Sequence, residues 1–305
     1  MTVDSSSRRS SIYGEGRLMR LTIVGGGIMG SGIAHAAAIA GFDTVLNDLS
    51  NERLDQALRS ITSLLDGGIE RGKLRSEDKP AILARLELEQ DLTAAVDGAD
   101  LVIEAVPEDI ALKRKIFDRL DEITSPSAVL ATNTSSLSIT EIATATNDPS
   151  RVIGMHFFNP VAKMKLIEIV RGAETSERAF RIAAEVAHKM GKETVDIRES
   201  PGFVTSRINA LIGNEAFHML EAGVASAEDI DKAVRLGLHH PMGPFEMIDM
   251  VGLDTRLGVL NYLHERLGET YRPSPLLVRF VQEGRLGRKV GRGVYDYREE
   301  KASKK

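Results

Sequence analysis

The sequence predicts an α/β protein: a Rossmann-type doubly wound sheet with a helical hairpin inserted in it, followed by an all-α C-terminal domain. Three observations lead to this prediction. A short apolar run ends in a glycine-rich turn and passes directly into an alanine-rich stretch, which is typical of a strand, a turn and a helix. Strand-like and helix-like segments then alternate up to about residue 200, as in a largely parallel sheet. Beyond that point the strand-like runs disappear.

The alternation begins with the run LMRLTIV at residues 18–24, which is followed by GGGIMG and SGIAHAAAIA. Gly41 ends the predicted helix, and DTVLND at residues 43–48 is the predicted second strand. Charged, helix-favouring sequence interrupted by glycines follows over residues 51–84. Because this stretch is too long for one simple crossover, we predict a helical hairpin inserted in the fold.

Further strands are predicted, with helical sequence between several of them. They cover residues 86–89, 101–106, 128–132, 152–156, 166–170 and 194–197. The helices predicted for the C-terminal domain cover residues 203–222, 226–236, 246–267 and 275–283. We therefore expect a Rossmann domain over residues 18–199 and a helical domain over residues 200–298. Residues 1–17 are expected to be a disordered extension and residues 299–305 a solvated tail, because both are polar and have little to bury.

The composition excludes several classes of protein. The chain has 305 residues, no cysteine and a formal net charge of -5. Without cysteine there can be no disulfide, thiolate nucleophile or thiolate metal site, and we predict no metal. The net charge gives no general attraction to nucleic acid. No apolar stretch approaches the roughly 20 residues that span a bilayer, and residues 1–17 lack the apolar core of a secretory signal. We therefore expect a cytoplasmic protein that binds neither nucleic acid nor membrane.

A dinucleotide fingerprint occupies the first turn. Its glycines match G-x-G-x-x-G between a strand and a helix, and Asp48 closes the next strand. A pyrophosphate would lie at the positive N-terminus of the helix, where a glycine lets the backbone approach it. The predicted cofactor contacts at this turn come from Gly25, Gly27, Ile28, Met29 and Gly30.

Asp48 indicates which dinucleotide is bound. Its carboxylate would accept hydrogen bonds from a ribose diol and repel a 2'-phosphate, and Leu49, Ser50 and Asn51 supply no adjacent cation. NAD is therefore expected in preference to NADP, although Arg53 leaves that preference open. FAD uses the same fingerprint and a glycine-rich turn can exist without a ligand, so the turn alone does not exclude either case.

One charged residue interrupts a later apolar strand. Glu168 lies in the run LIEIV, where an ionised carboxylate needs a partner, because burying it alone costs several kcal/mol or shifts its pKa until it neutralises. His156 ends the preceding predicted strand, at the edge where open α/β sheets bind ligands. If the two strands run antiparallel or the chain loops back between them, the carboxylate could hold one imidazole nitrogen as N–H and leave the other as a base. The alternative is a structural ion pair of Glu168 with Lys163 or Lys165.

Longer segments follow one another in a specific order: VGGGIMGSGIA, NTSSLSIT, GMHFFNP, MKLIEIV, SPGFVTSRI, GLHHPMGPFEMIDMVGLD and GRLGRKVGRGVYDY. In these segments the chain resembles the 3-hydroxyacyl-CoA dehydrogenases, particularly the bacterial 3-hydroxybutyryl-CoA dehydrogenases. The resemblance runs from about residue 19 to Tyr297 and so covers nearly the whole chain. It is much more specific than the glycine fingerprint alone.

The resemblance implies roles for individual residues. His156 would be the catalytic base with Glu168 as its partner, and Ser135 would hydrogen-bond the 3-oxygen of the substrate. Ser206 stands where the family has a substrate-contacting asparagine in PGF-x-x-N-R. Because serine is shorter and has one donor, we expect a bridging water or a subfamily difference rather than an identical contact. The positions that match those around the dinucleotide in the family are Glu108, Lys113, Asn133, Asn159 and Lys289.

The resemblance also implies partners and an activity. CoA would lie against the helical hairpin, where Arg71, Lys73 and Arg75 could attract its phosphates, and the helical domain would form a homodimer contact. The implied activity is the reversible, NAD-dependent oxidation of a (3S)-3-hydroxyacyl-CoA to the 3-oxoacyl-CoA. Two alternatives stay open, namely a dehydrogenase of a free hydroxy acid such as a sugar acid, and a non-catalytic NAD-binding or redox-sensing protein on the same fold.

Overall fold

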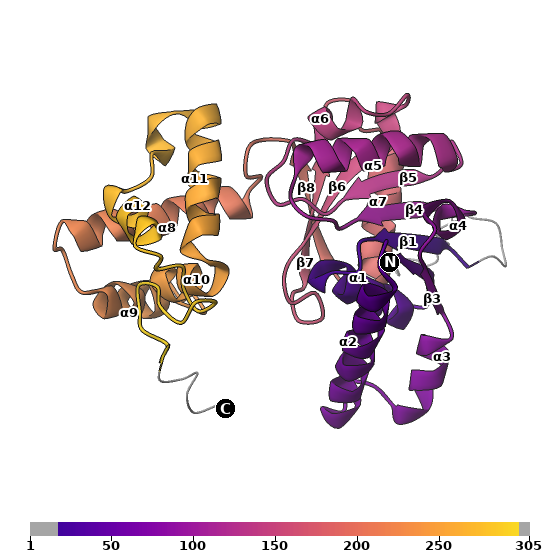
Figure 1. The fold of residues 1–305 in the computed structure, drawn as a ribbon, viewed down its shortest axis with the longest axis horizontal. Helices are drawn as coiled ribbons and strands as arrows, with labels where there is room; N and C mark the ends of the chain where they lie inside the picture. Colours follow the sequence, from indigo (N-terminus) through magenta and orange to yellow (C-terminus); the bar gives the residue numbers. More distant parts are fainter. Residues whose placement is uncertain (1–17, 299–305) are drawn as a thin grey trace, which may run out of the picture. The chain divides into compact units, whose positions relative to one another are not determined.

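The computed structural model describes residues 18–298. The extension predicted at residues 1–17 and the tail predicted at residues 299–305 lie outside the described residues. Contacts divide the chain into two units (Figure 1). Among the described residues, the first unit contains 18–134 and 138–199, and the second contains 135–137 and 200–298.

The first unit is built, over the described residues, on one eight-stranded sheet in the order β3-β2-β1-β4-β5-β6-β7-β8. Its strands are β1 (Arg20–Val24), β2 (Asp43–Asn47), β3 (Leu86–Glu89), β4 (Leu101–Glu104), β5 (Val129–Thr132), β6 (Val152–Phe157), β7 (Leu166–Arg171) and β8 (Glu193–Arg198). Neighbouring strands are parallel except for β6 and β7, which are antiparallel. The order reverses between β1 and β4, at the switch point of a doubly wound sheet. The predicted fold class is confirmed.

Helices cover both faces of this sheet. They are α1 (Ile28–Ile39), α2 (Asn51–Glu70), α3 (Lys79–Leu83), α4 (Leu92–Val96), α5 (Ile110–Ile123), α6 (Ile139–Ala143) and α7 (Glu177–Lys189), with 3-10 turns at Ser76–Asp78 and Pro149–Arg151. The apolar residues of α1, α2 and α7 share one core cluster with the strands. The short helices α4 and α6 and the longer α5 belong to the other face, where a Cβ at Gly154 of β6 would meet Ile139 of α6.

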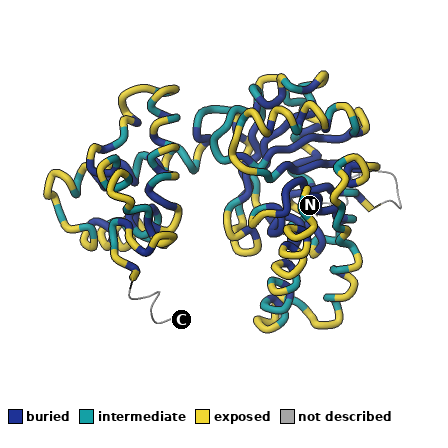
Figure 2. Tube along the Cα trace, in the orientation of Figure 1, coloured by how far each residue is buried: buried dark blue, intermediate teal, exposed yellow. Residues whose placement is uncertain are grey.

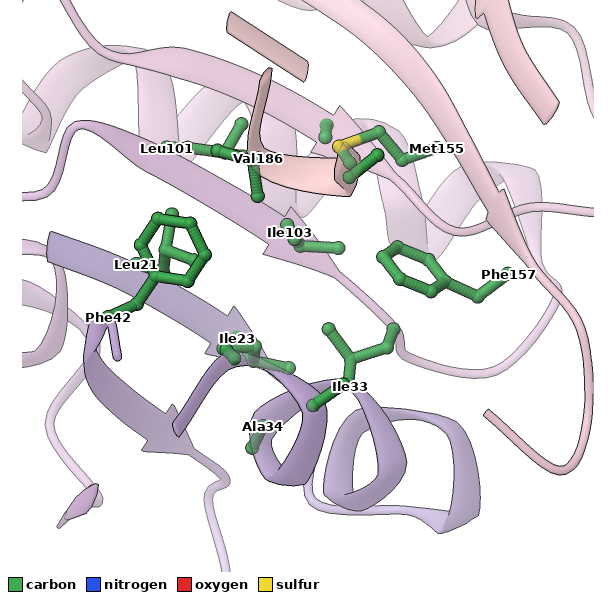
Figure 3. Close-up of a cluster of buried hydrophobic side chains, with 14 of the residues drawn as sticks. Leu21, Ile23, Ile33, Ala34, Phe42, Leu101, Ile103, Met155, Phe157 and Val186 are labelled. Carbon is green, nitrogen blue, oxygen red and sulfur yellow. The ribbon is translucent and has the colours of Figure 1, made fainter. Parts of the chain in front are cut away.

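The core cluster defines which strand residues point to which face. Figure 3 shows alternate strand residues facing α1 and α7, namely Leu21, Ile23, Leu101, Ile103, Met155 and Phe157, with Ile33, Ala34 and Val186 on the helices. Successive side chains of a strand point to opposite faces. The residues between these core positions, including Glu104 and His156, therefore point to the face that carries α4, α5 and α6.

The predicted helical hairpin is present, and its two arms are unequal (Figure 1). The long arm α2 begins after Ser50, whose hydroxyl accepts a hydrogen bond from the N–H of Arg53. A Cβ at Gly68 would lie 2.9 Å from Leu74, so the glycine lets the returning chain pack against α2. The buried residues of α2 recur every three or four positions, as in an amphipathic helix; they are Leu54, Ala57, Ile61, Leu65 and Gly68.

The helical unit departs from the prediction at one point. Its helices are α8 (Thr205–Glu221), α9 (Ala227–Gly237), α10 (Pro244–Val251), α11 (Leu253–Leu267) and α12 (Pro275–Gln282), with a 3-10 turn at Glu269–Tyr271. The single helix predicted over residues 246–267 is wrong, because α10 and α11 are separate. Gly252 between them has φ 112°, outside the helical region, and so ends α10 and redirects the chain.

Two buried carboxylates hold the C-terminal segment onto these helices. Asp231 of α9 accepts hydrogen bonds from the N–H of Phe245 at 2.8 Å and from the hydroxyl of Tyr295 at 2.8 Å. Asp249 of α10 accepts from the N–H groups of Val294 at 2.8 Å and Tyr295 at 2.9 Å. Burial raises the pKa of both carboxyl groups above the ordinary value, although each hydrogen bond favours the charged form. The segment after α12 is therefore part of this unit's fold.

Burial follows the layered arrangement of the first unit, with buried strands under helices that are exposed on their outer sides (Figure 2). The edge strand β8 differs, since Glu193, Asp196 and Arg198 are exposed. Charged residues on an edge strand oppose pairing with another chain. In the part of the chain that the structure describes, no helix is both long and apolar enough to cross a membrane.

His35 of α1 is buried, and neither of its ring nitrogens has a hydrogen-bond partner among the described residues. Burial, with a smaller contribution from the charge of Lys192, lowers the pKa of His35 from 6.5 to about 4. His35 is therefore protonated near pH 6.5 in the unfolded chain but only near pH 4 in the folded protein. Because the unfolded state binds more protons between these values, the free energy of unfolding falls as the pH is lowered through this interval.

We expect His35→Gln to remove most of this acid sensitivity. One pKa unit corresponds to about 1.4 kcal/mol, so His35 should account for on the order of 3 kcal/mol of the free energy of unfolding lost on acidification. Denaturant unfolding at neutral pH and at the acid end of the interval measures this loss. The same change at the exposed His218 is the control and should leave the pH dependence as in the wild type. Equal acid sensitivity in His35→Gln would contradict the assignment.

Candidate active site

The glycine turn follows β1 and leads into α1. Gly25 has φ 109°, and a Cβ on it would lie 2.9 Å from the carbonyl oxygen of Ala105. A Cβ on Gly30 would lie 1.8 Å from the carbonyl oxygen of Gly25, so only glycine permits this approach of helix and turn. A Cβ on Gly27 would meet nothing within 4 Å, which leaves open space over the helix N-terminus. The turn is therefore closely packed at Gly25 and Gly30 and open at Gly27.

The N-terminus of α1 suits a bound anion. Its first N–H groups, which include those of Ile28 and Met29, have no intrahelical partner by helix geometry, and no side chain caps this end. A helix N-terminus of this kind stabilises phosphate groups through its N–H groups and its dipole. The open turn and the uncapped helix therefore fit the pyrophosphate of a dinucleotide.

Asp48 follows β2 beside this turn. Its Oδ2 accepts a hydrogen bond from the N–H of Gly26 at 2.8 Å, and its Oδ1 accepts from the N–H of Ser50 at 3.1 Å. Arg53 approaches to 4.0 Å, between Nη1 and Oδ2. The N–H of Gly26 in the glycine turn thus orients the carboxylate of Asp48, and the guanidinium group of Arg53 lies close to that carboxylate.

His156 and Glu168 meet across the antiparallel pair β6 and β7, where they are direct register partners. The distance from Nδ1 of His156 to Oε2 of Glu168 is 2.7 Å. Glu168 is fully buried, and the histidine ring is 4.4 Å from the ring of Phe158. Lys163 and Lys165, the alternative partners of Glu168, are exposed on the connection between the strands. The structure therefore pairs the buried carboxylate with the histidine.

This geometry determines the chemistry that His156 can perform. An ionised carboxylate only accepts hydrogen bonds, so Nδ1 carries the proton and Nε2 keeps its lone pair. A neighbouring carboxylate also stabilises the imidazolium that forms when Nε2 takes a proton. The pair is suited to move a proton to and from a ligand at the carboxyl edge of the sheet.

Asn133 connects the neighbouring strand to this pair. Its side-chain oxygen accepts a hydrogen bond from the N–H of Phe157, the residue after His156, at 2.9 Å. The backbone N–H of Asn133 donates a hydrogen bond to the backbone carbonyl oxygen of Glu104 at 2.7 Å. Asn133 therefore links the ends of β4, β5 and β6. Ser135, two residues later in the chain, is half-buried, and it is assigned to the second unit.

Glu108 and Lys113 lie at the end of β4, and the structure places them differently from each other. Lys113 is fully buried, 2.7 Å from Oε1 of Glu104 and 3.5 Å from Oε2 of Glu108. Glu108 is partly exposed, and its Oε1 accepts a hydrogen bond from the hydroxyl of Thr134 at 2.6 Å. Lys113 therefore bridges one buried and one accessible carboxylate.

Sequence reasoning missed Glu104, which is fully buried at the end of β4. The signal was present, because Glu104 interrupts the apolar run LVIEAV as Glu168 interrupts LIEIV. The difference is that the partner of Glu104 is a lysine, which sequence alone suggests to be a surface residue.

The other predicted residues lie on separate elements of the first and the second unit. Asn159 is exposed after β6, in the connection that leads to β7. In the helical unit, Ser206 is half-buried in the first turn of α8, and Lys289 is exposed with its Nζ 2.6 Å from Asp254. On the hairpin, Arg71, Lys73 and Arg75 are exposed, and Arg75 pairs with Glu77 and Asp78 at 2.8 and 2.9 Å.

The sheet order and the glycine turn define a dinucleotide-binding protein of the Rossmann class. Residues 20–200 match the family described as "3-hydroxyacyl-CoA dehydrogenase, NAD binding domain", and residues 202–297 match "3-hydroxyacyl-CoA dehydrogenase, C-terminal domain". The chain is 45% identical to the probable 3-hydroxybutyryl-CoA dehydrogenase of Bacillus subtilis, over 94% of this chain and 99% of the relative. It is 44% identical to the 3-hydroxybutyryl-CoA dehydrogenase of Bradyrhizobium diazoefficiens, over 92% and 96%.

A solved structure agrees with these matches. The (S)-3-hydroxybutyryl-CoA dehydrogenase of Ralstonia eutropha superposes with a TM-score of 0.90 and 41% sequence identity, over 92% of this chain and 99% of that chain. The chain belongs to the 3-hydroxyacyl-CoA dehydrogenase family. It is an NAD-dependent oxidoreductase of this family, as the sequence resemblance predicts.

We expect Asp48 to set the preference for NADH over NADPH. Asp48→Asn keeps an oxygen that can accept from Gly26 but loses the charge that repels a 2'-phosphate, so it should narrow the ratio of kcat/KM for the two cofactors. Asp48→Ala should in addition weaken NADH binding. With the charge removed, Arg53 becomes available to a 2'-phosphate, and Arg53→Ala in the Asp48→Asn background should reduce NADPH use again. A wild-type preference for NADPH would contradict the role given to Asp48.

Proposed function

We propose that the protein catalyses the reversible oxidation of a (3S)-3-hydroxyacyl-CoA, with 3-hydroxybutyryl-CoA as substrate, to the 3-oxoacyl-CoA. The observation that carries the proposed mechanism is the buried contact of 2.7 Å between His156 and Glu168. The family and the names of the relatives support the substrate class over a free hydroxy acid.

In this proposal His156 is the general base, and Glu168 is its orienting partner. Nε2 takes the proton of the 3-hydroxyl, and Glu168 stabilises the resulting imidazolium through Nδ1. The bound nicotinamide supplies the hydride acceptor. In the reverse direction the imidazolium returns the proton to the 3-oxygen. Because Glu168 is fully buried, its charge acts on the imidazole with little screening by solvent.

The remaining residues would position the two ligands. Ser135 would donate a hydrogen bond to the 3-oxygen of the substrate, and Ser206 would lie at the substrate end of the site. Residues 18–199 would form the NAD-binding domain, and residues 200–298 the substrate and dimerisation domain. The proposed contacts to NAD come from Gly25, Gly27, Ile28, Met29, Gly30, Asp48, Glu108, Asn133, Asn159 and Lys289, and the buried Lys113 would act through Glu108.

Steady-state kinetics test the proposed reaction directly. We expect turnover of acyl-CoA substrates of increasing chain length, beginning with 3-hydroxybutyryl-CoA, with NAD as cofactor. Free hydroxy acids are the comparison set, and faster turnover of a free acid than of every acyl-CoA would overturn the proposed substrate class. The profile over chain length identifies the preferred acyl group.

The dyad makes a specific prediction for Glu168→Gln. The amide keeps the shape of the side chain but not the charge, and it can present its NH₂ where an acceptor is required. Loss of a general base typically lowers the rate by about 10²–10⁴-fold, so His156→Ala should fall in or beyond this range and Glu168→Gln should approach it. NADH affinity should be nearly unchanged in both. The double variant should be little worse than the poorer single variant, because residues that act as one unit are not additive.

The same variants separate catalysis from folding. A purely structural Glu168 predicts a lower melting temperature with normal activity per folded molecule, so full activity in folded Glu168→Gln would refute the dyad. Glu174→Gln changes an exposed carboxylate shortly after the same strand and should leave kcat/KM, NADH affinity and melting temperature unchanged.

Ser206 provides a test of the substrate end. Because the PGFVTSR segment otherwise keeps the family motif, Ser206→Asn should be tolerated, whereas Ser206→Ala should raise KM or lower kcat for the best acyl-CoA by removing a hydrogen bond worth about 1 kcal/mol. Unchanged kcat and KM in Ser206→Ala would remove Ser206 from the site.

A homodimer formed through the helical domain and a cytoplasmic location are further parts of the proposal, supported by the sequence resemblance and by the composition. The solution mass, which should be twice 33.2 kDa, tests the first, and fractionation of cells tests the second. A solution mass of 33.2 kDa would contradict the dimer.

A further inference from the structure

A second buried carboxylate lies at the switch point of the sheet, and the proposed mechanism does not use it. Glu104 is the register partner of Val24, the residue before the glycine turn, and of Thr132 on the other side. Its Oε1 accepts hydrogen bonds from Nζ of Lys113 and from the N–H of Val106, both at 2.7 Å. Its Oε2 accepts from the hydroxyl of Thr132 at 2.6 Å. One carboxylate thus joins β4, β5, α5 and the loop after β4.

The loop held by Glu104 forms part of the wall of the cofactor turn. A Cβ on Gly25 would lie 2.9 Å from the carbonyl oxygen of Ala105 and 3.2 Å from the nitrogen of Val106. The nitrogen of Val106 is the same atom that donates to Glu104. A shift of this loop would therefore be transmitted directly to the turn at the N-terminus of α1.

Lys113 extends the network toward the accessible edge. Its Nζ lies 2.7 Å from Glu104 and 3.5 Å from Glu108, and Glu108 is also held by the hydroxyl of Thr134 at 2.6 Å. Because the ammonium group is fully buried, it cannot itself reach out to a ligand in this arrangement. Its effect on a ligand must pass through Glu108 or through the loop after β4.

A buried ion pair of this kind is poor evidence for stability alone. The desolvation of both charges offsets much of their attraction, and apolar residues of similar size often fold as well or better. Unlike two apolar residues, the ion pair fixes the orientation of the groups that are hydrogen-bonded to it. The pair lies at the switch point, where ligands of doubly wound sheets bind, so the groups that it orients are those beside the ligand site.

We infer that Glu104 and Thr132 are positioning residues for the dinucleotide, which hold Lys113, Glu108 and the loop against Gly25 in the geometry that NAD requires. This inference rests on the proposed function only where it takes Glu108 and the glycine turn as cofactor contacts. Glu104 and Thr132 themselves touch neither cofactor nor substrate in this scheme.

The test is the affinity for NADH without substrate, measured from the fluorescence of NADH, together with the melting temperature. Glu104→Gln should raise the Kd for NADH about tenfold or more, because small displacements of a binding group have large effects, and it should also lower the melting temperature by leaving the buried ammonium group of Lys113 with only the 3.5 Å ion-pair contact to Glu108. The double variant Glu104→Gln/Lys113→Met removes that charge and should recover the melting temperature. Its Kd should stay raised, because Glu108 has lost the ammonium group.

A matched control lies elsewhere in the same unit. Asp121 and Arg151 form another buried pair at 2.8 Å, with side-chain exposures of 6% and 4%. Arg151 directly precedes β6, so this pair lies at the amino edge of the parallel strands, opposite the cofactor edge. Asp121→Asn should lower the melting temperature and leave the Kd for NADH unchanged.

Each outcome decides the inference. A wild-type Kd in Glu104→Gln, recovery of both Kd and melting temperature in the double variant, or an equal rise in Kd in Asp121→Asn would overturn it. If Glu104→Gln does not fold, Thr132→Val removes only one hydrogen bond from the carboxylate and should raise the Kd severalfold, and an unchanged Kd there also overturns it. Because NADH binding is measured without acyl-CoA, failure to oxidise acyl-CoA would refute the proposed substrate and leave this test intact.

Discussion

A carboxylate buried in a sheet must be matched by a partner, and this constraint organises the carboxyl edge of the first unit. Glu168 meets His156 across β6 and β7, and Glu104 meets Lys113 beneath the loop after β4. Each pair lies on the face that carries α4, α5 and α6, while alternate residues of the same strands form the apolar core against α1, α2 and α7. Strand alternation thus lets one sheet direct apolar residues to the core with α1, α2 and α7 while Glu104 and Glu168 point to the other face.

The antiparallel strand β7 makes the histidine site possible. In a parallel sheet, consecutive strands need a long crossover, and residues close in sequence do not face one another. Here the chain turns back after β6, so His156 and Glu168, 12 residues apart, become direct register partners. Asn133 then ties the end of β5 to the residue after His156. The His156–Glu168 pair and the glycine turn therefore lie on one continuous sheet.

The folded units override a local sequence preference at two places. Residues 246–267 have a continuous helical pattern, yet Gly252 adopts φ 112° and separates α10 from α11. Lysine is usually a surface residue. Lys113 is nevertheless fully buried, and its Nζ forms an ion pair with Glu104 at 2.7 Å. In both cases a contact or a backbone conformation specified by the folded unit outweighs a local preference. Glu168 is the opposite case, because a charged residue within an apolar strand already predicts from the sequence that a partner is needed.

The sequence by itself determined the order of the strands and of most helices, the glycine turn, the family, and the need of Glu168 for a partner, with His156, Lys163 or Lys165 as candidates. These follow from local periodicity, from glycine in a strand–turn–helix context and from a charge in an apolar run, all of which are readable within a short window. Only the tertiary structure decided that Glu104 binds Thr132, 28 residues away, as well as Lys113, and that Ala105 lies against Gly25. Such contacts depend on strand order and on which face each side chain takes, and these are properties of the assembled sheet that no short stretch of sequence contains.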